Sequence, residues 1–234
     1  MTGRDWLVIT GARSAIGRCV AQGWQARGGR VLGLSRYPDL SGTDRVLAAD
    51  LSAPEAAAAA LSELLEETGI IPRGFVHAAG VVFADEALNT TVDERRRMLS
   101  VNLEAAFTLM TALAGRTAAP ASFVLISSVD AMRAPGAGPA AVYGAAKAGL
   151  EALVRHLAVE WGMQGIRINA IRPGPMAGGM GIRRDPASYA ARTADRRLPT
   201  PEEVGDAALF LLGAGARGIT GQILAVDHGF GLAY

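Results

Sequence analysis

Short apolar runs alternate with longer segments of helical period along the chain. The runs are almost continuously apolar, as in parallel strands that helices cover on both faces. They predict strands at residues 5–11, 30–35, 44–50, 74–79, 122–128, 166–172 and 222–227. The segments between them predict helices at residues 17–27, 54–67, 91–114, 142–161 and 201–213. This alternation predicts a doubly wound α/β fold with a mostly parallel, seven-stranded Rossmann-type sheet and helices on both faces.

One segment does not follow the alternation. Residues 175–198 are rich in glycine and then in arginine, and they are too long for an ordinary connection in a compact domain. We expect them to form a lid over a substrate. Since no linker, repeat or second periodic region is evident, residues 1–234 are interpreted as a single domain.

Composition argues against several classes of function. A formal net charge of +1 offers no basic surface for nucleic acid or an anionic membrane. One cysteine and three scattered histidines give no disulfide and no metal-ligand spacing, so we expect no metal. Neither a signal peptide nor a membrane-spanning run is recognisable. These features favour a cytoplasmic protein whose partner is a small molecule.

A glycine-rich turn from Thr10 to Gly17 follows the first predicted strand and leads into a helix. Glycine lets the backbone approach a pyrophosphate, and the N–H groups of the helix N-terminus bind it. A tight turn without a ligand would look similar. The position directly after the first strand favours a dinucleotide-binding turn.

The end of the second predicted strand indicates which dinucleotide is bound. Sites for NAD carry an acid there for the ribose 2′-hydroxyl, whereas this chain has Ser35 followed by Arg36. Arg13 lies in the glycine turn, and an adenosine 2′-phosphate requires such a pair of cations. Asp39 is near in sequence but lies beyond Pro38. The pattern predicts NADP(H) as the cofactor.

Tyr143 and Lys147 are four residues apart in a predicted helix, so they share one helix face. Of the 23 lysine and arginine residues, only Lys147 is a lysine. A surface contact is the alternative interpretation, but a surface position in this protein carries arginine. A tyrosine titrates near ~10, and a neighbouring ammonium is expected to lower that pKa toward the range of proton transfer. The pair therefore indicates acid–base catalysis.

These segments together resemble the short-chain dehydrogenase/reductase family, in particular members like the 3-oxoacyl-(acyl carrier protein) reductases. The glycine turn resembles T-G-x-x-x-G-x-G with Ala15 at the middle glycine, and "YGAAK" matches Y-x-x-x-K. The resemblance implies that Tyr143 transfers a proton and that Lys147 also binds the nicotinamide ribose.

The resemblance implies two further catalytic residues. Ser128 in "ISS" matches the serine that orients the substrate oxygen. Ser127 remains the alternative, because the interval from Ser128 to Tyr143 is two residues longer than the family usually has. Asn102 matches the asparagine that holds a proton-relay water. The catalytic set implied is Asn102, Ser128, Tyr143 and Lys147.

The resemblance also implies a cofactor-binding set: Gly11, Arg13, Ser14, Ile16, Gly17, Arg36, Asp50, Leu51, His77, Ala79, Gly80, Tyr143, Lys147, Pro173, Gly174 and Met176. Three segments depart from the family pattern. His77 and Ala78 stand where N-N-A-G begins, Gly178 replaces a threonine, and His228 replaces a common glycine. We interpret His77 as a strand-end residue beside the cofactor and not as a catalyst.

The function predicted is NADP(H)-dependent reduction of a ketone to an alcohol, or the reverse. The alternatives are a catalytically silent NADP(H) sensor and a nucleotide-sugar epimerase or dehydratase. The substrate is open between a 3-oxoacyl thioester and another ketone. The lid carries five arginines and two aspartates that either bind an anionic group or are simply solvated: Arg183, Arg184, Arg192, Arg196, Arg197, Asp185 and Asp195. The resemblance also implies a homotetramer or homodimer that pairs through the helices at 91–114 and 142–161.

Overall fold

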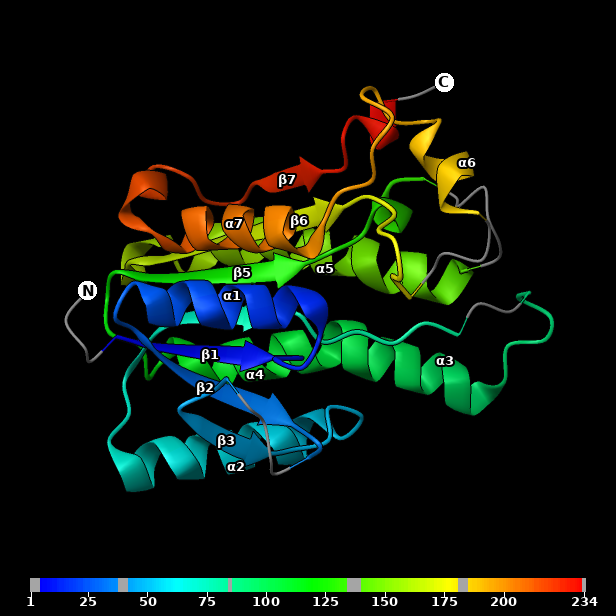
Figure 1. Cartoon of the computed structure of the whole chain (residues 1–234). Coiled ribbons are helices and arrows are strands. Elements are labelled where there is room, and N and C mark those ends of the chain that lie inside the picture. The colour runs from blue at the N-terminus through cyan, green and yellow to red at the C-terminus, as the bar shows by residue number, and fades with distance from the viewer. Residues whose placement is uncertain (1–4, 38–41, 84–85, 134–139, 181–184, 233–234) are drawn as a thin grey trace.

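The computed structural model describes residues 5–37, 42–83, 86–133, 140–180 and 185–232. Within them the strands are β1 Trp6–Thr10, β2 Arg30–Ser35, β3 Arg45–Ala48, β4 Pro72–His77, β5 Ala121–Ile126, β6 Ile166–Pro173 and β7 Ile223–Val226. All neighbours pair in parallel, in the order β3-β2-β1-β4-β5-β6-β7. The prediction of a seven-stranded, doubly wound sheet is confirmed (Figure 1).

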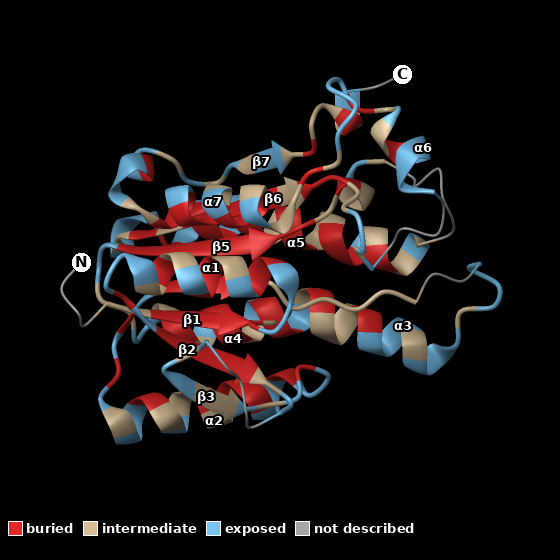
Figure 2. Ribbon diagram, in the orientation of Figure 1, coloured by how far each residue is buried: buried red, intermediate tan, exposed pale blue. Residues whose placement is uncertain are grey.

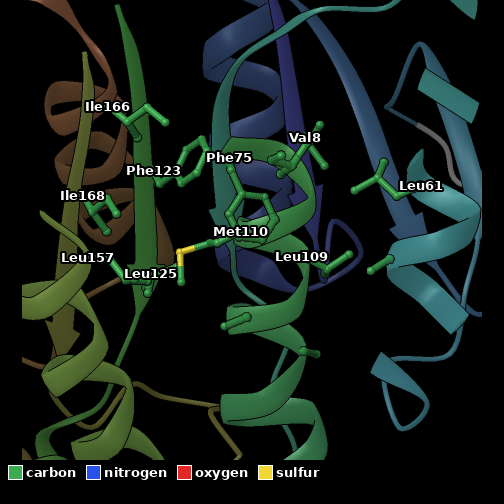
Figure 3. Packing of buried hydrophobic residues seen from close by; sticks show 14 of the residues in the cluster. Val8, Leu61, Phe75, Leu109, Met110, Phe123, Leu125, Leu157, Ile166 and Ile168 are labelled. Atoms are coloured by element: carbon green, nitrogen blue, oxygen red, sulfur yellow. The ribbon is translucent and has the colours of Figure 1, made fainter. Parts of the chain in front are cut away.

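The helices lie on both faces of this sheet. They are α1 Ala15–Ala26, α2 Pro54–Thr68, α3 Val92–Leu99, α4 Ala105–Ala114, α5 Ala141–Glu160, α6 Pro186–Ala190 and α7 Pro201–Leu212. One hydrophobic cluster joins α1 and α7 to the sheet, and a second joins α2, α4 and α5 to its other face. Figure 2 shows the central strands buried between helices that are exposed on their outer sides, whereas the edge strands β3 and β7 are only partly covered. In the second cluster Phe75 and Phe123 meet edge to face, with ring centroids 5.8 Å apart (Figure 3).

Local sequence explains where several helices begin. Thr91 and Thr200 each form a capping box with the glutamate three residues later, so the free N–H groups of α3 and α7 gain partners. Pro54 and Pro201 occupy first-turn positions, where the missing N–H costs nothing. Helix α2 ends at Gly69, whose φ of 64° suits glycine.

The helix predicted over residues 91–114 differs from the structure, because a π-helical turn, η1 Ser100–Glu104, separates α3 from α4. The Asn102 side chain is the cause. Its Nδ2 donates to the Met98 carbonyl at 2.8 Å, which is the acceptor that an α-helix assigns to the Asn102 backbone N–H. The hydrogen-bond ladder therefore lengthens, and the Ala105 N–H bonds to the Ser100 carbonyl instead.

The carboxyl ends of the strands meet at one edge of the sheet (Figure 1). The chain order reverses between β1 and β4, and open α/β sheets bind their ligands at such a reversal. The connections that follow β1, β4, β5 and β6 all leave from this edge. No helix in the described ranges is both long and apolar enough to cross a membrane.

Candidate active site

Helix α5 carries Tyr143 and Lys147 beside the carboxyl end of β5. The two residues are 9% and 2% exposed. The Lys147 Nζ donates a hydrogen bond of 2.7 Å to the Ile126 carbonyl at the last residue of β5. It lies 5.7 Å from the centre of the Tyr143 ring. The structure thus brings the phenol and the ammonium to one buried place.

Burial dominates the acid–base properties of this pair. It lowers the pKa of Lys147 to about 7 and raises the pKa of Tyr143 to about 12. Each shift favours the neutral form, because a charged group loses hydration when it is buried. The lowering of the Tyr143 pKa that the sequence led us to expect from Lys147 is therefore not found. The phenol is held in its protonated form.

The two serines at the end of β5 have different partners. The Ser128 hydroxyl lies near enough to the Tyr143 phenol to moderate the rise in the pKa of the phenol. Ser127 is 3% exposed and donates to Glu151 Oε1 at 2.8 Å. Glu151 in turn forms a partly buried ion pair with Arg172, with Nη2 and Oε2 2.5 Å apart. The structure therefore places Ser128, and not Ser127, beside the phenol.

Asn102 is fully buried, so it is not a mid-helix residue turned to solvent. Besides the bond to Met98, its Nδ2 donates to the Val81 carbonyl at 2.7 Å, and its Oδ1 accepts from the Val81 N–H at 3.3 Å. The π-turn and the segment after β4 are thus joined through one side chain. A Cβ built on Gly80 would lie 3.1 Å from Asn102 Oδ1 and 3.8 Å from Lys147 Nζ. Asn102, Gly80 and Lys147 therefore surround the same space.

His77 is fully buried at the end of β4. Its Nε2 donates to the Val101 carbonyl at 3.1 Å, so its Nδ1 accepts the Thr10 hydroxyl at 3.0 Å. Burial lowers the pKa of the imidazole to about 3, which keeps it neutral. Both ring nitrogens are thus used to join β1, β4 and the π-turn. This role supports the interpretation that His77 is not a catalyst.

The turn after β1 has the shape that a dinucleotide requires. Gly11 has a φ of 66°, and a Cβ there would lie 2.6 Å from the Ala79 nitrogen. A Cβ on Gly17 would lie 2.3 Å from the Gly11 carbonyl oxygen. Ser14 caps α1 by accepting from the Gly17 N–H at 3.0 Å. Ala15 is exposed at the first turn of α1, so its methyl group is accommodated at the middle glycine position. The residues present therefore fit a bound pyrophosphate at the N-terminus of α1.

Two arginines converge at the end of β2. The guanidinium carbon of Arg13 lies 4.7 Å from the centre of the Tyr37 ring, and that of Arg36 lies 5.9 Å from the same ring. Asp50 accepts from the Ser52 N–H at 2.9 Å, and this bond and the charge of Arg36 help to lower its pKa. Asp39 lies outside the described residues.

The remaining predicted cofactor residues lie around the same edge. Leu51 is buried after β3. Pro173 ends β6, and Gly174 follows it in close contact with Asp227, since a Cβ on Gly174 would lie 2.8 Å from the Asp227 Cβ. Met176 is partly buried against the α1–α7 cluster. Met180 is a residue that the sequence did not single out. A Cβ on Gly80 would lie 3.4 Å from its Cε, which brings the segment after β6 next to Gly80.

The predicted lid contains α6 and is fixed at its end by His228. The imidazole contacts Asp195 Oδ2 through Nδ1 at 2.7 Å and Glu203 Oε2 through Nε2 at 3.0 Å. Arg197 pairs with the same two carboxylates. His228 has a φ of 51°, in the left-handed region that favours glycine, the residue that the family resemblance implies there. The sequence shows a histidine where the resemblance implies glycine, but it does not show that the imidazole contacts Asp195 and Glu203.

The lid arginines that the structure describes contact residues of the lid itself or of the segments packed beside it. The guanidinium carbon of Arg192 lies 4.6 Å from the centre of the Phe230 ring. Arg196 donates to the Ala191 carbonyl, and Asp185 caps α6 through the Ala187 N–H. Arg183 and Arg184 lie outside the described residues. In the described ranges, no group of histidine, cysteine, aspartate and glutamate has an arrangement that could hold a metal ion.

A family model described as enoyl-(acyl carrier protein) reductase, from the short-chain dehydrogenase/reductase group, matches residues 11–231. The chain therefore belongs to the short-chain dehydrogenase/reductase family, whose members are oxidoreductases that bind a nicotinamide cofactor. Galactitol 2-dehydrogenase (L-tagatose-forming) of Cereibacter sphaeroides is 31% identical over 95% of this chain and 93% of its own length.

Two further relatives and one solved structure are also similar to this chain. The 2-dehydro-3-deoxy-D-gluconate 5-dehydrogenase of Bacillus subtilis is 29% identical over 95% of this chain and 93% of its own length. The NADH-dependent enoyl-(acyl carrier protein) reductase 2 of Rhizobium meliloti is 46% identical, but over only 39% of this chain and 36% of its own length. The crystal structure of the TT0495 protein from Thermus thermophilus superposes with a TM-score of 0.87 at 34% identity, covering 97% of this chain and 98% of that one.

Proposed function

We propose that the protein is an NADP(H)-dependent oxidoreductase that interconverts a ketone and a secondary alcohol. The observation that carries this proposal is the group of Ser128, Tyr143 and Lys147 at the carboxyl end of β5, in which Tyr143 and Lys147 are buried. A protein that only binds the dinucleotide has no need of a buried phenol beside a serine hydroxyl. The galactitol and gluconate dehydrogenase relatives act on alcohols by their names, which favours the same chemistry.

Each residue of the site is proposed to have a separate role in the reaction. A bound nicotinamide would supply the hydride for the carbonyl carbon, or take up the hydride that the alcohol releases. Ser128 orients the carbonyl oxygen toward Tyr143, and the protonated phenol donates its proton to that oxygen. Lys147 stabilises the phenolate that remains, provided that it carries its own proton. Asn102 holds the segment around Gly80, which lies beside Lys147, in place through its bonds to Met98 and Val81.

The cofactor preference is proposed from Arg13 and Arg36. Their guanidinium groups lie near one aromatic ring at the end of β2, where an NAD site would place an acid. Paired cations at this position favour an adenosine 2′-phosphate. The segment 175–198 is proposed as the substrate lid, and a homotetramer or homodimer through α4 and α5 as the assembly. Phe107 on α4 and Val159 on α5 are 44% and 84% exposed, which supports a covered surface there.

Reduction of an enoyl thioester is a second candidate, because the matching family model carries that description. The enoyl reductase from Rhizobium meliloti aligns with about two fifths of the chain, whereas the alcohol dehydrogenase relatives align with nearly all of it. A peroxisomal 2,4-dienoyl-CoA reductase of Pongo abelii is also 29% identical over 97% of this chain, so relatives of both kinds align with nearly all of it. The carbonyl reaction is therefore proposed from the arrangement of Ser128, Tyr143 and Lys147 and not from the relatives alone.

Steady-state oxidation of NADPH and NADH tests the proposal, with acetoacetyl-coenzyme A, simple ketones, hydroxy ketones and crotonyl-coenzyme A as substrates. We expect turnover with a ketone and formation of the alcohol. Turnover with crotonyl-coenzyme A alone would favour the second candidate. Binding of NADPH without turnover on any substrate would favour the sensor.

A further inference from the structure

A tyrosine just after β2 contacts both arginines of the cofactor site. The guanidinium carbons of Arg13 and Arg36 lie 4.7 Å and 5.9 Å from the centre of the Tyr37 ring, each within the range of a cation–π contact. The side chain is 54% exposed and belongs to none of the hydrophobic clusters of the described chain. The contacts of the ring are therefore with the two cations and not with the core.

Local hydrogen bonds fix the backbone on both sides of these contacts. The Tyr37 N–H donates to the Ser35 hydroxyl at 3.1 Å, which turns the chain directly after the last residue of β2. The Arg18 guanidinium, from α1, donates to the Arg13 carbonyl at 2.7 Å. Ser35 stands where an NAD site carries its acid. The residue that replaces the acid thus helps to place the aromatic ring.

The charges of the two arginines oppose their close approach. Among the described residues, no carboxylate forms an ion pair with either guanidinium. The electron-rich face of an aromatic ring attracts cations, so Tyr37 favours the presence of both at one place. A cation–π contact needs no hydrogen-bond acceptor, so it leaves the N–H donors of a guanidinium for phosphate oxygens.

We propose that Tyr37 is a positioning residue for the choice of cofactor, and that its ring holds Arg13 and Arg36 together so that both bind the phosphate on the adenosine 2′-oxygen. This inference rests on the proposed preference for NADP(H). Without the ring, the ligand itself would have to order two long side chains against their repulsion. The ring reduces that cost before the ligand arrives. It should therefore strengthen the binding of a 2′-phosphate and have little effect on a nucleotide without one.

Titration of the nicotinamide fluorescence of NADPH and of NADH tests this role without catalysis. The two ligands differ only in the 2′-phosphate. We expect Tyr37→Leu to raise the Kd for NADPH by about fivefold or more, as the loss of two exposed cation–π contacts implies. The Kd for NADH should change by less than about twofold, because NADH has no group for the arginines to bind together. Tyr37→Phe keeps the ring, so both Kd values should stay within about twofold of the wild-type values.

A double-mutant cycle shows whether the ring acts through the arginines. When Arg13→Ala and Arg36→Ala have removed both cations, Tyr37→Leu should change the Kd for NADPH by less than about twofold. Arg30→Ala is the matched control, because it removes a cation–π contact of 5.5 Å with Trp6 at the other end of β2. It should leave both Kd values unchanged. Circular dichroism must show that each variant is folded.

The outcomes separate the positioning role from the proposed cofactor preference. Equal weakening of NADPH and NADH in Tyr37→Leu would mean that the ring binds the adenine. Tighter binding of NADPH would mean that the ring occupies the place of the phosphate. Either result, an unchanged Kd, or an effect that persists without the arginines overturns the positioning role, and the preference stands if the wild-type protein binds NADPH more tightly than NADH. A wild-type protein that binds NADH at least as tightly as NADPH overturns both.

Discussion

The Nζ of Lys147 lies 5.7 Å from the centre of the Tyr143 ring, one helical turn away on α5. One of its hydrogens is bound by the Ile126 carbonyl at 2.7 Å, which fixes the ammonium at the end of β5. Two donors remain for other partners. This arrangement gives a physical reason why the single lysine of the chain stands here: a planar guanidinium cannot direct one donor to a strand end and others to a neighbouring ligand from so small a space.

Lys147→Arg should retain the charge but displace it. We expect kcat to fall by two or more orders of magnitude, which is about 3 kcal/mol of barrier. Since Lys147 is only 2% exposed, circular dichroism and the thermal midpoint must show that the variant is folded. Arg155→Lys, at an exposed position of the same helix, is the control that should leave kcat unchanged. A kcat near the wild-type value would mean that the lone lysine is an accident of composition.

Arg36→Ala should reveal the cofactor preference. Loss of one cation beside a 2′-phosphate weakens a charge-assisted hydrogen bond, so the KM for NADPH should rise by about tenfold or more. The KM for NADH should change much less, because NADH lacks the phosphate. Arg30→Ala, at the opposite end of β2 from Arg36, provides the control. If the wild-type protein already prefers NADH, the argument from Arg13 and Arg36 is wrong.

His228 should make the stability depend on pH. Contacts with Glu203 and Asp195 raise its pKa, so the contacts stabilise the fold fully below the unfolded value of about 6.5. That stabilisation is lost as the pH rises through the folded pKa. His228→Gly removes the contacts and relieves the positive φ. We expect the wild-type protein to have the higher thermal midpoint at pH 6, and this advantage to shrink by pH 9.

His156→Gln, at an exposed position of α5, is the control. Its thermal midpoint should differ from that of the wild-type protein by the same amount at pH 6 and at pH 9. If the thermal midpoints of the wild-type protein and His228→Gly differ by the same amount at both pH values, His228 is not the group whose titration stabilises the lid.

The fold was predictable because each strand is a short apolar run that needs cover on both faces. What the sequence could not provide depends on contacts between distant segments. The break at Asn102 follows from its bond to the Met98 carbonyl, and the Asn102 side chain is also bound by the Val81 carbonyl from the distant segment after β4. The choice between Ser127 and Ser128 needs Glu151 on α5. The pattern of residues also could not reveal that Arg13 and Arg36 contact the same Tyr37 ring, since such contacts are properties of the folded chain.

The most direct test of the central claim is Tyr143→Phe, which removes the proton donor and keeps the ring that packs beside Lys147. Turnover should be measured with the best ketone, and the binding of NADPH by titration calorimetry. We predict that turnover falls below detection while the Kd for NADPH stays within about threefold of the wild-type value. Turnover near the wild-type rate with a folded variant would contradict the assignment of Tyr143 as the group that transfers the proton.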